Sequence, residues 1–198
     1  MNRILSIYLL ILCIFAPLNL LAEHDCIDER EYGHQVTVEK NLPKNWLTIG
    51  GILINDSRLH NILRTKYAKN YTTGKDHEGF TIDHFCGFKN GIYLVISNGD
   101  FGPSAEFSKE TPKCFPCKHV KEEMPYFISG TGLKIGQDKK TASSILRYEI
   151  DNDITSISFE EIETGKTHNI WHSQTLRIEF RDNKLLRFSI YDSRENYN

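Results

Sequence analysis

Apolar residues are scarce in this 198-residue chain once its amino terminus is set aside. The whole chain is 39% apolar, but the first 22 residues hold so many apolar side chains that the rest falls to about 34%. This share is low for a globular domain of such length. It excludes a protein with several membrane spans, and it disfavours a large parallel sheet, whose strands need continuous apolar runs.

The chain also lacks an excess of positive charge, because its formal net charge is −2. No basic stripe with interleaved aromatic residues occurs along the sequence. Proteins that bind nucleic acid neutralise phosphates with such stripes. Nucleic acid is therefore not an expected partner.

Motifs for catalysis and cofactor binding are missing as well. The glycines of residues 130–136 have the wrong spacing for a phosphate-binding loop, and no Gly-x-Ser-x-Gly sequence is present. His168 and His172 fall on a predicted strand, where residues four apart lie about 13 Å from each other, too far for one metal ion. We therefore predict a protein that is not an enzyme and that has no catalytic residues, no metal and no cofactor.

Three neighbouring carboxylates, Glu160, Glu161 and Glu163, could suggest a glycoside hydrolase. Such enzymes hold two carboxyl groups across a cleft, whereas adjacent residues of a strand point to opposite faces. The pattern indicates a solvated strand edge.

The amino terminus has the features of an export signal. A cationic start at Arg3 precedes an apolar run over residues 4–16, and Pro17 and the small Ala22 follow. At 1.5 Å per residue this run spans only about 20 Å, which is short of the ~30 Å hydrocarbon core. No cysteine has the small preceding residue of a lipoprotein. We predict cleavage near Ala22, a periplasmic or secreted protein and no stable membrane anchor.

Four cysteines remain after export: Cys26, Cys86, Cys114 and Cys117. An even number in an oxidising compartment predicts two disulfides. The preferred pairing joins Cys86 to Cys117 or Cys114 and leaves the other of these two for Cys26. The Cys-x-x-Cys spacing of residues 114–117 keeps open an alternative of another class, a thiol-disulfide oxidoreductase. The polar residues before Cys114, Pro112 among them, disfavour the strand that such a site requires.

Two segments of the chain share an ordered set of features, which indicates a repeat. GILINDS at 51–57 and GLKIGQD at 132–138 each lead into a short amphipathic helix, with Asp56 and Asp138 as amino-terminal caps. Alternating strands follow, and they end at turn dipeptides such as Asp182-Asn183. The predicted fold class is α+β, with two tandem units that each pack a short helix on an antiparallel meander. The predicted segments are a signal peptide (1–22), an arm (23–46), a first repeat (47–110), a cysteine-containing linker (111–129) and a second repeat (130–198).

The glycine-aliphatic entry, the short helix and the meander resemble the repeat of the beta-lactamase inhibitory proteins. They are also similar to the single unit of the outer-membrane assembly lipoprotein BamE. The clearest match is residues 132–140, and the resemblance covers roughly residues 47–191. It implies a non-catalytic scaffold whose tandem sheets present a concave face to another protein, and it transfers no contact residue.

Side chains that point away from the helices supply a candidate binding face. If Leu176, Ile178 and Phe180 face the helix, the strand alternation directs their neighbours outward. The candidate residues are Tyr93, Val95, Phe101, Arg177, Glu179, Arg187 and Tyr191. Arginine and tyrosine often anchor protein interfaces, although an ordinary solvated sheet face would look the same. The resulting hypothesis is a module that binds another envelope or secreted protein, with an inhibitor or immunity role as one form of it. The alternative within this class is a factor for cell-envelope assembly or maintenance.

Overall fold

The computed structural model describes residues 33–75, 81–99, 102–112, 117–120, 128–164 and 169–197. Residues Glu31–Asn198 form one compact unit. The predicted signal peptide, residues 1–22, lies outside the described residues. Within the described ranges, no helix combines the length and the apolar character that a membrane crossing requires.

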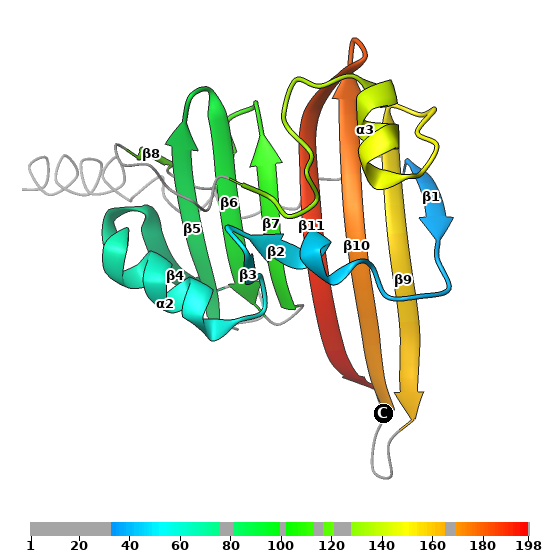
Figure 1. Cartoon of the computed structure of the whole chain (residues 1–198). Helices are drawn as coiled ribbons and strands as arrows, with labels where there is room; N and C mark the ends of the chain where they lie inside the picture. The colour runs from blue at the N-terminus through cyan, green and yellow to red at the C-terminus, as the bar shows by residue number, and fades with distance from the viewer. Residues whose placement is uncertain are drawn as a thin grey trace, which may run out of the picture. The chain divides into compact units, whose positions relative to one another are not determined.

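Most of the strands belong to one large sheet (Figure 1). The strands are β1 (His34–Thr37), β2 (Thr48–Ile49), β3 (Ile52–Leu53), β4 (Tyr71–Lys75), β5 (Thr81–Lys89), β6 (Ile92–Gly99), β7 (Gly102–Ser108), β8 (Lys118–His119), β9 (Ile154–Thr164), β10 (Asn169–Arg181) and β11 (Lys184–Tyr197). The nine-stranded sheet has the order β1-β9-β10-β11-β7-β6-β5-β4, with β8 beside β5, and β2 and β3 form a separate pair. Within the nine-stranded sheet β1 and β8 pair in parallel with their neighbours, and the other pairs are antiparallel.

The predicted fold class, two tandem units of a helix on a meander, is wrong. One mixed sheet dominates the structure, and the described residues hold only two short α-helices. β7 and β11 would have been edges of the two units, but they pair with each other from Ser104↔Tyr191 to Ser108↔Arg187. This pairing satisfies backbone N–H and C=O groups that two separate units would each have left at an exposed edge.

The two helices begin where their aspartate caps predicted. They are α2 (Ser57–Lys66) and α3 (Lys139–Leu146), and short 3₁₀ helices occupy Lys44–Leu47 (η2) and Ala68–Asn70 (η3). The Asp56 carboxylate accepts a hydrogen bond from a first-turn backbone N–H at 2.9 Å, and Asp138 does the same at 2.8 Å. Such caps satisfy donors that a helix cannot pair internally.

A single apolar core lies between the sheet and the two helices. Figure 1 shows both helices and the β2–β3 pair in front of the sheet. The helices contribute the buried side chains Leu59, Leu63, Ala142 and Leu146. One row of buried side chains crosses six strands in register: Ile157, Leu176, Ile190, Ala105, Ile96 and Phe85. A core on one face only is consistent with the low apolar share of the sequence, because the other face needs no apolar side chains.

Three strands continue together past the ends of their other neighbours, as the long arrows of β9, β10 and β11 in Figure 1 show. β1 pairs with β9 only as far as Ser158, and β7 pairs with β11 only as far as Tyr191. Beyond these points, residues 159–164, 169–174 and 192–197 pair only with one another within the described chain. We call these residues the three-stranded extension.

Candidate functional site

The predicted binding residues gather on the sheet face opposite α2 and α3, which we call the outer face. Six of the seven lie in the described chain, namely Tyr93, Val95, Arg177, Glu179, Arg187 and Tyr191, and Phe101 lies outside it. Each alternates with a buried core residue of its own strand. Cross-strand pairing places Arg187 between Ser108 and Glu179, and Ser108 opposite Tyr93. The register therefore brings residues from both halves of the sequence into one surface.

Ion pairs hold the charged part of the outer face in a defined arrangement. Arg187 Nη2 lies 2.7 Å from Glu110 Oε2, and its Nε lies 3.3 Å from Glu179 Oε2. Arg181 Nη1 reaches the other Glu110 oxygen at 2.8 Å. The side chains of Arg187 and Glu179 are only 15% and 18% exposed, so this pair is less screened by solvent than a surface pair. The network orients planar guanidinium groups that can also bind carboxylates of a partner.

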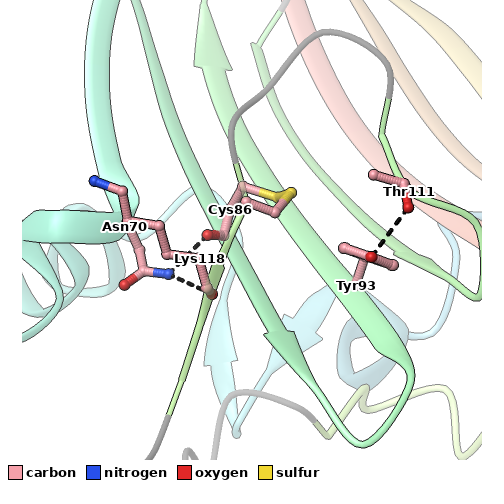
Figure 2. The surroundings of a disulfide bond; sticks show 6 residues. Asn70, Cys86, Tyr93, Thr111 and Lys118 are labelled. Carbon is pink, nitrogen blue, oxygen red and sulfur yellow. Dashed lines mark hydrogen bonds between the residues drawn. A yellow bond between two sulfur atoms is a disulfide. The ribbon is translucent and has the colours of Figure 1, made fainter.

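Aromatic rings form the other part of the outer face. The Phe88 and Tyr93 rings lie 4.6 Å apart, and the His119 ring contacts Phe88 edge-on at 6.0 Å. The Thr111 hydroxyl donates to the Tyr93 hydroxyl at 3.0 Å (Figure 2). Tyr93 is thus held by β5 and by the segment that follows β7.

A disulfide fixes residues of the predicted linker to β5. Cys86 and Cys117 are bonded, with their Cα atoms 4.7 Å apart. Figure 2 shows that the Asn70 side-chain amide donates to the backbone oxygens of Cys86 and Lys118, each at 2.9 Å. The spacing of the cysteines left Cys114 and Cys117 open as partners of Cys86, and the structure selects Cys117.

The other two cysteines, Cys26 and Cys114, lie outside the described residues. The thiol-redox alternative predicted a bridge between Cys114 and Cys117. In this structure Cys117 is bonded to Cys86 instead.

A buried polar cluster lies on the helix-side face of the three-stranded extension. Asp192 Oδ1 is 3.0 Å from His172 Nε2 and accepts from the Gln174 amide at 3.3 Å. Asp192 Oδ2 accepts from the Asn55 amide at 2.6 Å, and Gln174 Oε1 accepts from the Leu42 N–H at 3.0 Å. The side chains of His172 and Asp192 are 5% and 6% exposed. The cluster therefore joins the segment before η2, the loop before α2 and two strands.

Sequence reasoning missed this cluster, because it considered His172 only as a possible metal ligand together with His168. The alternation of side chains along β10 could have revealed the cluster. His172 and Gln174 fall on the same face as Leu176 and Ile178, and all four are buried. In β11, Asp192 continues the alternation of Ile190 in the same way. The described residues contain no group of His, Cys, Asp or Glu side chains that could hold a metal ion. The hydrogen bonds of the cluster connect segments that are distant in the sequence.

A cavity of about 430 Å³ opens at the point where β1 leaves β9. Its lining residues are Glu39, Lys40, Asn41, Phe159, Glu160 and Glu161. Among the lining residues, Phe159 adjoins the polar cluster, since its ring contacts the His172 ring edge-on at 5.9 Å. The cavity is mostly polar and charged at its rim, which suits a peptide side chain better than an apolar small molecule.

Burial perturbs one histidine of the outer face and one of the helix side. Burial lowers the pKa of His84, whose Nδ1 lies 2.9 Å from Ser97 Oγ. Burial also lowers the pKa of His60 in α2, although a hydrogen bond with the backbone of Ile54 opposes this effect. Both imidazoles are therefore held in the neutral form more strongly than in water.

Comparison with known proteins gives no relative. No family model, no curated protein and no solved structure matches this chain. The resemblance to the beta-lactamase inhibitory proteins and to BamE therefore stays a prediction.

Proposed function

We propose that this protein is an exported, non-catalytic module whose outer face binds another envelope or secreted protein. The observation that carries the proposal is the register of β6, β7, β11 and β10. It assembles Tyr93, Arg187, Glu179 and Arg177 into neighbouring positions on one surface. These residues are far apart in the sequence, so the surface depends on the complete sheet.

The chemistry of the outer face suits a protein partner. Interface centres are enriched in tyrosine and arginine, which combine a large contact area with directed hydrogen bonds. Tyr191 is 37% exposed and offers such an anchor. The Arg187 ion pairs hold that guanidinium in place before a partner arrives, which lowers the entropy lost on binding.

Photo-crosslinking from the outer face tests the proposal. A benzophenone amino acid at position 191 is expected to capture a specific protein in envelope extracts, identified by mass spectrometry. The matched control carries the same group at position 145, because Ile145 of α3 is 38% exposed on the opposite side of the sheet. Capture of the same proteins from both positions, or of none from position 191, contradicts the proposal.

A pair of variants tests the side chains themselves. Arg177→Glu combined with Tyr93→Ala is expected to abolish capture of the crosslinked partner on an affinity column. Lys140→Glu combined with Ile145→Ala makes a similar change on α3 and should leave capture intact. Thermal melts of both variants exclude unfolding as the cause. Equal recovery with the two variants counts against the outer face.

A further inference from the structure

Among the described residues, no strand pairs with β9 on the side away from β10 over residues 159–164, which we call the free edge of β9. β1 lies beside β9 up to the hydrogen bond from the Val38 N–H to the Ser158 oxygen, 2.8 Å long. Residues 39–41 make no further backbone hydrogen bond to β9 among the described residues, although they line the cavity beside residues 159–161. From Phe159 to Thr164, β9 pairs only with β10 among the described residues.

The backbone groups on this edge alternate in direction. Because the Ser158 oxygen points toward β1, every second residue after it points the same way. The N–H and C=O groups of Glu160, Ile162 and Thr164 are therefore directed outward. No backbone partner of these groups lies among the described residues. Such an edge is a template for another extended segment.

The side chains along the edge select a class of segment. Glu160, Glu161 and Glu163 are exposed, so carboxylates stand on both faces of the edge, as the sequence predicted for a solvated strand edge. Ile162 is 59% exposed between them and lies opposite Trp171 of β10. A strand added here would place basic side chains beside the glutamates and an apolar side chain beside Ile162.

Charge also argues against two alternative occupants. A second copy of this edge would bring like charges into register, which is unfavourable. Residues 23–32 of the chain are acidic, with five carboxylates and one arginine, so they are repelled as well. The cavity at the start of the edge is lined by three carboxylates, Glu39, Glu160 and Glu161, against one cation, Lys40, so it offers space for a further basic side chain.

We propose that the free edge of β9, residues 159–164, binds an extended basic segment of another protein by strand addition. The segment has the pattern basic, basic, apolar, basic opposite residues 160–163. This site lies on the edge of the extension and does not depend on the outer face.

Direct binding of designed peptides tests the proposal. The probe is the labelled heptapeptide Thr-Lys-Lys-Val-Lys-Lys-Thr, which reads the same in both strand directions. Its binding to the oxidised protein is followed by fluorescence anisotropy at low and at physiological salt. The control peptides replace the lysines with glutamate or the central valine with proline. We expect only the parent peptide to bind, because proline removes a backbone donor and disfavours a regular strand. Equal binding of the proline peptide would show that only charge is recognised and would overturn strand addition.

Protein variants locate the site. Glu160→Lys combined with Glu163→Lys is expected to weaken parent-peptide binding at least about tenfold. Asp151→Lys, at an exposed position before the other end of β9, is the charge control and should retain binding within about twofold. Arg177→Glu combined with Tyr93→Ala should also retain it, which separates this inference from the proposed function. Loss of binding in either control, or retention in the β9 variant, refutes the site.

Hydrogen exchange tests the proposal on the unmodified protein, so that no substitution can affect its folding. On addition of the parent peptide, the amides of Glu160, Ile162 and Thr164 should gain protection. Those of Glu161 and Glu163 already point toward β10 and should change little. Uniform protection along β9, or none, contradicts the predicted alternation.

Discussion

The two faces of the large sheet are built from the same strands and differ in almost every property. In β11, Phe188 and Ile190 are buried in the core, whereas Arg187 and Tyr191 lie on the outer face. The helix-side face holds one apolar core with a polar cluster at its end, and the outer face holds ion pairs and aromatic rings. One strand thus supports the core with one half of its side chains and supplies the other half to the face for which we propose a binding role.

The largest expected effect is the loss of unfolding free energy caused by Phe188→Ala in the core, compared with that caused by Tyr191→Ala on the outer face. The Phe188 ring is 1% exposed and stacks on the Phe107 ring at 4.8 Å, so its loss should cost about 3–5 kcal/mol of unfolding free energy. Tyr191→Ala, three residues further on the outer face, should cost less than about 1 kcal/mol. Urea denaturation measures both. Similar losses would show that the outer face is also part of the core.

The disulfide is the exception to this comparison, because it stabilises the fold from the outer face. Cys86 and Cys117 are 31 residues apart, and closing a loop of this size contributes about 3–4 kcal/mol. The double variant Cys86→Ala, Cys117→Ala should lower the urea midpoint accordingly. Asn70→Ala removes only the neighbouring amide hydrogen bonds and should cost about 1 kcal/mol. A double variant as stable as the oxidised protein would contradict a structural role.

A smaller loss is expected from Asp192→Ala in the buried polar cluster. The substitution leaves donors of His172, Gln174 and Asn55 without their acceptor, at a cost of about 1–3 kcal/mol. Glu195→Ala, on the other face of the same strand, should change the unfolding free energy by less than about 0.5 kcal/mol. Thermal melts distinguish the two. Equal effects would mean that the cluster does not join the segments it contacts.

The smallest effect is a dependence of stability on pH that arises from His60. Burial lowers the pKa of His60 in the folded state, so below about pH 6.5 the unfolded chain binds a proton that the folded protein resists. Stability should therefore fall as the pH drops through about 6.5 toward the folded pKa, and then stop falling. His60→Gln should reduce the slope of this part of the profile in urea titrations, and the slope that remains is expected from His84, whose pKa burial also lowers. An unchanged profile in the variant would exclude His60 as the cause.

Local features of the fold could be predicted from the sequence, but the way they join could not. The aspartate caps and the alternation of Leu176, Ile178 and Phe180 each depend on a few neighbouring residues, and both are confirmed. The pairing of β7 with β11 depends on residues about 80 positions apart, and no local pattern encodes it. The repeat therefore suggested two units where one sheet exists.

The candidate sites show the same division. The alternation along each strand predicted which side chains point away from the core, so Tyr93 and Arg187 could be assigned to the outer face from the sequence. The spacing of Cys114 and Cys117 could not decide which of them reaches Cys86, because the two lie only three residues apart and are almost equally far from Cys86 along the chain. The buried Asp192 went unnoticed because carboxylates are rarely buried, and only its three donors make its position favourable.

The contact between β7 and β11 also has a consequence for the order of folding. The ladder joins residues 104–108 to residues 187–191, so it closes a loop of about 80 residues and adds strongly to the contact order. When the chain emerges amino terminus first, the edge of β7 that pairs with β11 has no partner until β11 itself has been synthesised. During this interval β7 is an unprotected sheet edge, and a chain that ended before β11 would keep it exposed permanently. β11 is thus the element that protects the β7 edge from association with other chains.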